Sequence, residues 1–243
     1  MVRHILFGAV VFLTNVIQCV TGFAGTVLAM PFSVLLVGYD VAKPILNVLG
    51  LLASVYVAAV CYRHIRKKEL AVIVGVMTVG MGVGIYLKRF FTGDPTLLYR
   101  TLGVVVIAFA VMNAALFFTK RESVRLPTPL SVLLLVAAGV VHGMFVCGGP
   151  LLVTYASGKL RGKDAFRGTL SAAWILLNGI LFVTDLAGGA FTPPTVKLSL
   201  ACVPVLALAL FLGNRVAKKL DRRVFLILTY ILMLVSGVSL LVK

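Results

Sequence analysis

Charged residues are scarce in this sequence, and acidic residues are the scarcest of them. Only 12% of the 243 residues are charged, with 7 Asp or Glu against 23 Lys or Arg. Hydrophobic residues make up 61% of the chain, and its mean hydropathy is +1.11. A soluble domain of this length needs far more polar surface. The composition therefore predicts a membrane protein.

Motifs of catalysis and metal binding are also missing. The 3 histidines and 4 cysteines form no CxxC pair and no zinc-binding spacing, and the chain has no GxSxG, no HExxH and no paired carboxylates. Asp40, Asp164 and Asp185 lie at the ends of apolar segments, and no Asp or Glu lies in the middle of one. We therefore expect no enzyme, no metal site, no cofactor, and neither a cation site nor a proton relay made of carboxylates.

Long apolar runs fill most of the chain. Runs of about 18 residues or more indicate transmembrane helices, and six are clear: 41–62, 70–87, 97–118, 166–185, 195–214 and 223–242. Residues 5–37 and 130–157 are equally apolar but are interrupted by glycines and polar side chains. We expect residues 1–243 to form one integral, all-α polytopic membrane domain with a retained N-terminal segment.

The positive charges gather in a few loops. Four loops each carry three to five Lys or Arg residues, namely 63–69, 120–125, 158–167 and 215–223. Short basic loops stay cytoplasmic and contact anionic lipid, which explains the net charge of +16 without nucleic acid. With all four loops inside, the segment 130–157 begins and ends inside. It must therefore enter the membrane and return as a re-entrant hairpin or a pair of half-helices.

The first interrupted segment follows the same reasoning with less support from charge. One helix over residues 5–37 would be about 50 Å long, far longer than the bilayer core requires. A hairpin fits this length better. It places Arg3, Lys88 and Arg89 outside, against the positive-inside rule.

The two halves of the chain resemble each other. Five pairs of similar residues are separated by 124 positions: Gly25 and Gly149, Gln18 and His142, Asp40 and Asp164, Lys43 and Arg167, Asn47 and Ser171. Each half, about 5–119 and 129–242, is expected to form a broken helical hairpin followed by three transmembrane helices. Because three is odd, the halves should be inverted relative to each other, as in many transporters.

The interrupted segments predict a binding site. Irregular backbone at membrane depth is tolerated only where protein or water covers it. In "CVTGFAGTVLAMP" a helix is expected to begin near Thr26, and in "FVCGGPLLVTYA" Pro150 suits the first helical position. Two helix starts that face each other would hold a small anion with free backbone N–H groups. The predicted substrate-binding residues are Gln18, Thr21, Gly22, Gly25, Thr26, Asn47, His142, Cys147, Gly148, Gly149, Thr169 and Ser171.

Simpler structural roles remain open for many of these residues. Gly148 and Gly149 could serve close helix packing, and Thr169 and Ser171 could bond to carbonyls of their own helix. Gln18 and Asn47 could bond to other helices, and the cysteines could be small buried hydrophobes. Lys43 and Arg167 are predicted to attract the anion at the mouths of the pathway, and the alternative is snorkelling to the membrane surface.

Both segments resemble the twin glycine-rich signatures of the TauE/SafE sulfite exporter family, also called the toluene-sulfonate uptake permease family. The resemblance rests on "QCVTGFAGTVLAMPFSVLL" and "HGMFVCGGPLLVTYASG", with Ala24 where the family often has glycine. Elements around Gly84 and Gly213 also look familiar. The resemblance implies transport of sulfur-containing anions such as sulfite or organosulfonates, and it does not imply a direction.

We therefore expect a secondary transporter that moves such an anion across the cytoplasmic membrane by alternating access. The expected partners are the anion, membrane lipid and a coupling ion, either a proton or sodium; no ATP-binding loop is present. The sequence leaves the oligomeric state unassigned. The alternatives are a transporter of another anion or a neutral solute, and a membrane scaffold without transport.

Overall fold

The structure, a computed structural model, describes residues 2–21, 24–88, 90, 94–119, 127–216 and 222–242. Within these ranges the chain forms helices only. The first half contains α1 (Val2–Thr21), α2 (Ala24–Val37), α3 (Tyr39–Val60), a short 3-10 helix (Tyr62–His64), α4 (Lys67–Lys88) and α5 (Pro95–Phe118). The second half contains α6 (Thr128–Phe145), α7 (Gly149–Lys159), α8 (Lys163–Ala187), α9 (Pro193–Val216) and α10 (Arg222–Leu241). The predicted all-α fold is confirmed, and each of the six predicted spans coincides with a helix.

Local sequence explains where several helices begin and end. Asp94 caps α5 by accepting hydrogen bonds from the backbone N–H groups of Thr96 and Leu97 at 2.9 and 3.1 Å, as an N-cap carboxylate does. Pro95 follows in the first turn, where a missing N–H costs nothing. The helix α6 ends where Val146 adopts the left-handed conformation with φ 57°.

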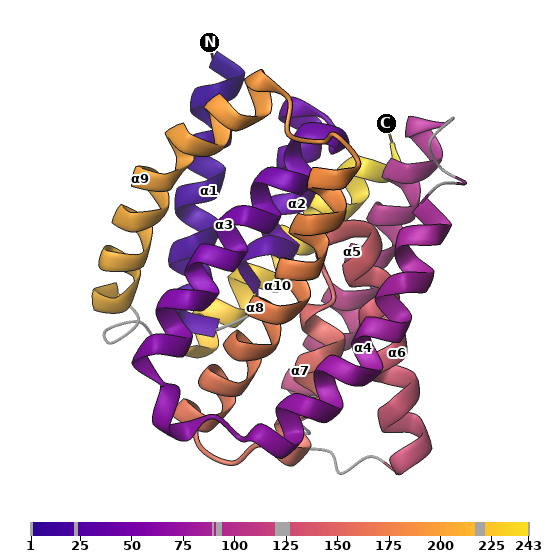
Figure 1. The fold of residues 1–243 in the computed structure, drawn as a ribbon, viewed down its shortest axis with the longest axis vertical. Helices are drawn as coiled ribbons and strands as arrows, with labels where there is room; N and C mark the ends of the chain where they lie inside the picture. Colours follow the sequence, from indigo (N-terminus) through magenta and orange to yellow (C-terminus); the bar gives the residue numbers. More distant parts are fainter. Residues whose placement is uncertain are drawn as a thin grey trace.

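The two interrupted segments form helical hairpins. In each half, a long first helix is followed by a shorter one, α1 by α2 and α6 by α7, and the break in the second hairpin falls at residues 146–148. Figure 1 shows α1 running down from the upper end of the molecule, whereas α6 runs up from the lower end. The N-terminus, the C-terminus and the α8–α9 connection lie at the upper end, and the α3–α4 and α7–α8 connections lie at the lower end.

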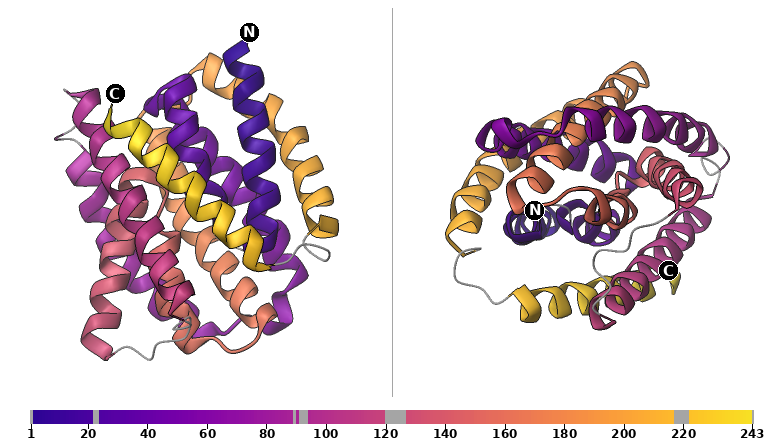
Figure 2. Two further views of the ribbon diagram at one scale, coloured as in Figure 1. Left: turned by 180° about the vertical axis from the view of Figure 1, so that it is seen from behind. Right: turned by 90° about the horizontal axis from the view of Figure 1, so that it is seen from below.

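Helix pairs across the molecule follow the order of the two halves. The most extensive contacts join α4 with α6, α5 with α10, α3 with α8, and α1 with α9. Suppose that α1–α5 of the first half correspond in order to α6–α10 of the second. The contact between α4 and α6 then has its equivalent in the contact between α9 and α1, and the pairs α5–α10 and α3–α8 each join two corresponding helices. Figure 2 shows the resulting arrangement from behind and from below, with α10 crossing in front of the bundle and α1 beside α9. All four pairs therefore join a helix of the first half to a helix of the second.

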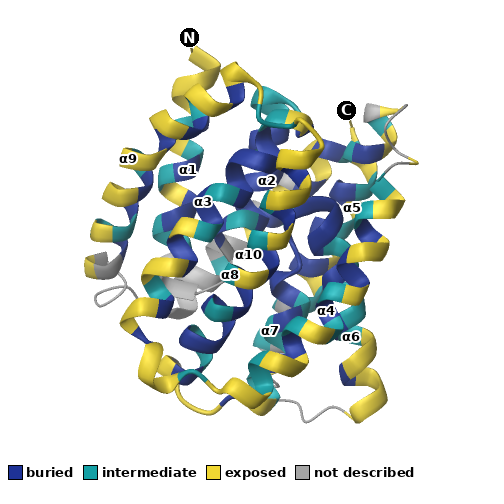
Figure 3. Ribbon diagram, viewed as in Figure 1, coloured by how far each residue is buried: buried dark blue, intermediate teal, exposed yellow. Residues whose placement is uncertain are grey.

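The outer surface of the bundle is apolar. Large hydrophobic side chains are exposed on its outer helices, including Val79 on α4, Leu133 on α6, Leu200 on α9 and Val235 on α10. Figure 3 shows exposed residues along the periphery and buried residues on α2, α3 and the inward faces of other helices. In the described part of the chain, five helices are long and apolar enough to cross a membrane, α3, α4, α6, α8 and α9. An apolar exterior suits contact with lipid.

Glycines let α4 and α6 approach closely. A Cβ atom on Gly80 or Gly84 of α4 would overlap the carbonyl oxygens of Val136 or Val140 of α6. Conversely, a Cβ atom on Gly139 of α6 would overlap the carbonyl oxygen of Met77 of α4. Small residues at this spacing are typical of tightly packed membrane helices.

Two glycines with the same unusual backbone begin the central helices. Gly38 precedes α3 with φ 82° and ψ 162°, and Gly162 precedes α8 with φ 91° and ψ 140°. Gly162 lies 124 positions after Gly38, the same separation as the residue pairs noted in the sequence. The shared conformation extends the likeness of the halves from sequence to backbone geometry.

Replacing Gly38 or Gly162 with alanine should destabilise the protein. Positive φ with extended ψ is nearly restricted to glycine, and other residues are strained there by about 1–3 kcal/mol. No neighbouring atom would obstruct the new Cβ at either position, so the cost comes from the backbone. Unfolding by SDS titration in mixed micelles measures this loss of stability. Gly8→Ala, in open space on α1, is the control and should be neutral or stabilising by up to about 1 kcal/mol; equal stability of all three variants would contradict the argument.

Candidate functional site

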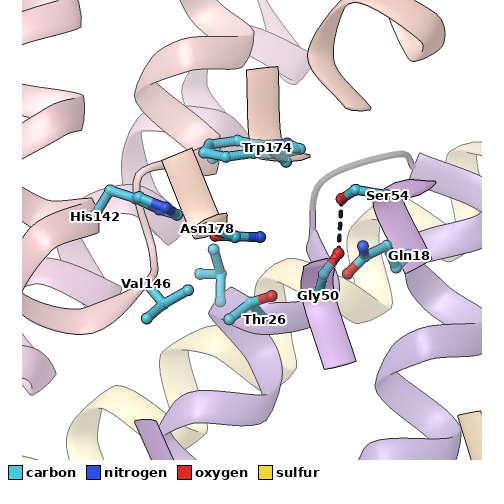
Figure 4. Close-up of a pocket in the computed structure, with 10 residues that line it drawn as sticks. Gln18, Thr26, Gly50, Ser54, His142, Val146, Trp174 and Asn178 are labelled. Carbon is cyan, nitrogen blue, oxygen red and sulfur yellow. Dashed lines mark hydrogen bonds between the residues drawn. The ribbon is translucent and has the colours of Figure 1, made fainter. Parts of the chain in front are cut away.

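A small cavity lies where the two hairpins meet the two central helices. Its volume is about 20 Å³, which is room for about one water molecule. Figure 4 shows side chains from both halves of the chain converging on it. The lining residues are Gln18, Thr26, Val27, Gly50, Ser54, His142, Val146, Gly149, Trp174 and Asn178.

The lining is built from matched positions in the two halves. Gln18 and His142, Gly50 and Trp174, and Ser54 and Asn178 are three pairs separated by 124 positions. The members of each pair come from corresponding helices: α1 and α6 in the first, α3 and α8 in the other two. The cavity therefore lies between the halves and receives equivalent contributions from each.

Asparagines link the central helices beside the cavity. The side-chain amide of Asn47 donates to the backbone carbonyl of Asn178 at 3.1 Å, which ties α3 to α8. The side-chain oxygens of Asn47 and Asn178 are buried and accept no hydrogen bond within the described residues. A buried polar atom without a partner is costly, and in a cavity it indicates room for a bound polar group.

His142 lies at the wall of the cavity with its ring fully inside the protein. The residue is 2% exposed, and its ring stacks at a tilt on Trp174, with 4.9 Å between the ring centroids. Neither ring nitrogen has a hydrogen-bond partner in the parts of the chain that are described, although Asn178 lies beside it in Figure 4. An ionisable residue inside a membrane protein is a candidate functional residue.

The first turns of α2 and α7 form part of the cavity wall. Thr26 and Val27 lie in the first turn of α2, and Gly149 begins α7 with Pro150 in its first turn, as the sequence predicts. The backbone is crowded here: a Cβ on Gly25 would overlap the side chain of Gln18, and a Cβ on Gly148 would overlap the carbonyl oxygen of Ala138.

Cys147 forms part of this crowded tip without lining the cavity. Its thiol is completely buried and donates to the carbonyl oxygen of Phe145 at 3.0 Å. It also lies 3.9 Å from the carbonyl oxygen of Thr26. Cys147 therefore connects the two hairpin tips through backbone oxygens.

The predicted binding residues fall into three groups. Four of them line the cavity, namely Gln18, Thr26, His142 and Gly149. Gly25, Asn47, Cys147, Gly148, Thr169 and Ser171 are buried but are not part of the lining. Gly22 and the side chain of Thr21 lie outside the described residues, so the structure says nothing of the roles predicted for them.

Thr169 lies apart from the cavity and has another partner. Its hydroxyl oxygen accepts a hydrogen bond from the backbone N–H of Arg66 at 3.0 Å. Arg66 belongs to the connection between α3 and α4, at the lower end of the bundle in Figure 1. This bond anchors that connection to α8.

Lys43 and Arg167 occupy different surroundings from each other. Lys43 is 3% exposed, and its ammonium group forms an ion pair with Asp185 of α8 at 2.5 Å. The sequence predicted Lys43 as a charge that attracts the anion at the mouth of the pathway, with snorkelling as the alternative; in this structure its charge is buried and paired. Arg167 is partly buried, and its Nε has no hydrogen-bond partner among the described residues.

Sequence reasoning missed four lining residues on the central helices: Gly50, Ser54, Trp174 and Asn178. A signal for them exists. On α3, Asn47, Gly50 and Ser54 are spaced by three and four residues, and so are Ser171, Trp174 and Asn178 on α8. This spacing places each trio on one helix face.

The cavity offers hydrogen-bond donors and no negative charge. Amide, hydroxyl, imidazole and indole groups line it, and no Asp or Glu is among the described lining residues. Within the described residues, no cluster of three or more His, Cys, Asp or Glu residues could hold a metal ion. Such a lining suits a small anion or a polar neutral molecule better than a cation.

Comparison with known proteins gives a family for this architecture. A family model described as "Sulfite exporter TauE/SafE" matches residues 7–240, nearly the whole chain and both halves of the site. Neither the curated proteins nor the solved structures gave a match. The chain therefore belongs to the TauE/SafE sulfite exporter family, a family of multi-pass membrane transporters for sulfur-containing anions.

Proposed function

We propose that this protein is a secondary transporter that binds a small sulfur oxyanion or organosulfonate in the cavity between the hairpins. The single observation that carries the proposal is the cavity itself. It lies between the halves, is rich in hydrogen-bond donors, lacks carboxylates among its described lining, and contains unpartnered polar atoms of His142 and Asn178 nearby. Sulfonate and sulfite oxygens accept hydrogen bonds from groups of this kind.

The backbone supports the same ligand class. The helices α2 and α7 begin at the cavity, and the first turn of a helix has free N–H groups and partial positive charge. Thr26 and Gly149 would place these N–H groups against the anion, while Gln18 and Asn178 would orient its oxygens.

The halves are proposed to be inverted repeats that rock against each other. The opposite directions of α1 and α6 support this, together with the matched helix pairs and the shared conformation of Gly38 and Gly162. The cavity has room for about one water molecule in this conformation, and the proposed motion separates the halves on one side to admit the larger anion. Alternating access follows from such a motion. We place the basic loops in the cytoplasm and the protein in the cytoplasmic membrane, because short basic loops favour that side.

The single tryptophan of the chain reports on this site. The chain contains 1 Trp, and Trp174 lines the cavity, so tryptophan fluorescence, excited selectively over tyrosine, comes from the site alone. Titration of purified protein with sulfite, thiosulfate, isethionate, sulfoacetate, taurine, sulfate, phosphate and acetate should change the emission for one class of sulfur anion. The same ligand should raise the apparent melting temperature by mass action. Responses to carboxylates or neutral solutes alone would contradict the proposed substrate class, and no response to any compound would favour a scaffold.

Asn178→Leu should weaken binding of the responding anion by about tenfold or more, because a hydrogen bond to a charged group contributes about 1.5–3 kcal/mol. The side-chain oxygen of Asn178 has no partner within the described residues, so the fold should tolerate the change. Ser199→Ala on α9 is the control, because Ser199 is also buried without a described partner but lies outside the cavity lining. Equal affinity of the two variants would place the site elsewhere.

A further inference from the structure

The structure of the cavity also bears on the ion that accompanies the substrate. This inference rests on the proposed function and concerns the same site. A lone anion is costly to hold inside a membrane protein unless a positive charge accompanies it. The question is which group near the cavity supplies that charge.

Lys43, Asp185 and Glu69, on the helices around the cavity, already have partners. Lys43 is held by Asp185 at 2.5 Å, and neither residue belongs to the lining. Glu69 accepts a hydrogen bond from Tyr155 at 2.9 Å. The titratable residues on the helices and the turn around the cavity include Tyr39 and Lys43 of α3, Glu69 and Lys88 of α4, Cys147 in the hairpin turn, Tyr155 of α7, and Arg167 and Asp185 of α8.

None of these groups belongs to the lining of the cavity. Tyr39 donates its hydroxyl to the carbonyl oxygen of Met144, and Lys88 lies over the ring of Tyr39, 5.0 Å from its centroid. Cys147 donates to the carbonyl oxygen of Phe145. In the described lining, His142 is the ionisable side chain that can gain a positive charge.

Both ring nitrogens of His142 are available for this role. Neither has a hydrogen-bond partner in the described parts of the chain, and the residue is 2% exposed. An imidazolium presents two N–H donors, one for the anion and one for a neighbour such as Asn178. A bound anion stabilises that imidazolium, and by linkage the imidazolium strengthens anion binding equally.

We propose that His142 takes up one proton when the anion binds and releases it when the anion leaves, so that the protein carries the anion together with a proton. The proton adds to the lone pair of a ring nitrogen on the side where the anion enters, and it leaves from the same nitrogen on the other side. The loaded site is then electrically neutral for a monoanion. The sum of the anion and proton gradients sets the direction of net transport.

Proton uptake on binding tests the proposal directly. Purified protein in weakly buffered detergent solution with a pH indicator is mixed with isethionate and, separately, with thiosulfate, both of which stay fully ionised near neutral pH. We expect uptake of about one proton per bound anion, the capacity of one imidazole. Protonation should also quench Trp174, because an imidazolium quenches indole emission more strongly than a neutral imidazole does.

His142→Gln should still fold, should bind isethionate more weakly, and should take up no proton on binding. The matched control is His64→Gln, which removes a histidine from the exposed 3-10 helix and should keep proton uptake unchanged. In proteoliposomes, an imposed gradient of one pH unit should drive about tenfold accumulation of isethionate by the parent protein, and no accumulation by His142→Gln. If His142→Gln does not fold, His142→Asn is the second variant, with the same expected loss of proton uptake and of accumulation.

The outcomes separate the two claims. Failure of both anions to bind would contradict the proposed function and this inference with it. Binding without proton uptake, or accumulation driven by a sodium gradient alone, would contradict the inference and leave the anion site intact. Proton uptake that persists in His142→Gln would assign the proton to another group and would also overturn the proposal.

Discussion

Lys43→Met is expected to lower the free energy of unfolding by about 3–5 kcal/mol, because it leaves the buried carboxylate of Asp185 without a counter-charge. Both partners are almost fully buried, with side-chain exposures of 4% and 9%, and their atoms lie 2.5 Å apart. The second carboxylate oxygen of Asp185 has no partner in the described structure, so nothing else there would stabilise the charge. SDS titration in mixed micelles, followed by circular dichroism, measures the effect.

The double variant Lys43→Met with Asp185→Leu distinguishes a lost charge partner from lost packing. Replacing both members of a buried pair with apolar residues is often neutral or stabilising, so most of the stability should return. Lys197→Met on α9, an exposed position, should change stability little. A double variant as unstable as Lys43→Met would show that the lysine acts through its packing instead.

Gly80→Leu is expected to cost at least about 3 kcal/mol and to reduce the yield of folded protein. Extra atoms in a packed interior cost about 1–3 kcal/mol even where side chains can move aside. Here the first added atom would meet the carbonyl oxygen of Val136, a backbone atom that cannot move without shifting α6. The helices α4 and α6 must therefore separate, and α6 carries His142 at the cavity.

The same helix offers a matched control. Gly82 lies two residues further along α4, and no atom lies within 4 Å of the Cβ that a substitution would add. Gly82→Leu should therefore leave both the yield and the SDS midpoint near those of the parent protein. Equal losses in the two variants would mean that helix propensity, and not the contact with α6, decides the effect.

The sequence predicted the helices well because membrane insertion constrains them strongly. Long apolar runs identified the six spans to within a few residues, and loop charge identified the hairpin at residues 130–157, which breaks at residues 146–148. Both signals are local in the chain. They need no knowledge of which helices pack together.

The site was predicted only in part, because it depends on contacts between distant helices. Gln18, His142 and Gly149 followed from their place in the interrupted segments, and all three line the cavity. Trp174 and Ser54 did not, since an aromatic or a hydroxyl residue in an apolar helix is usually structural. Lys43 was predicted as a charge at the mouth of the pathway. Its ion pair with Asp185 could not be predicted, because Asp185 lies 142 residues away in the sequence and only the folded chain brings them together.

The packing of α1 against α9 has a consequence for how the protein is made. The helix α1 (Val2–Thr21) is synthesised before α9 (Pro193–Val216), the helix packed against it, and about 170 residues separate the end of α1 from the start of α9. At about 5–20 residues per second, α1 waits roughly ten seconds or longer in the bilayer before its partner is synthesised. During that interval lipid or the insertion machinery must cover the inner face of α1, and a chain truncated before α9 should be a substrate for membrane proteases.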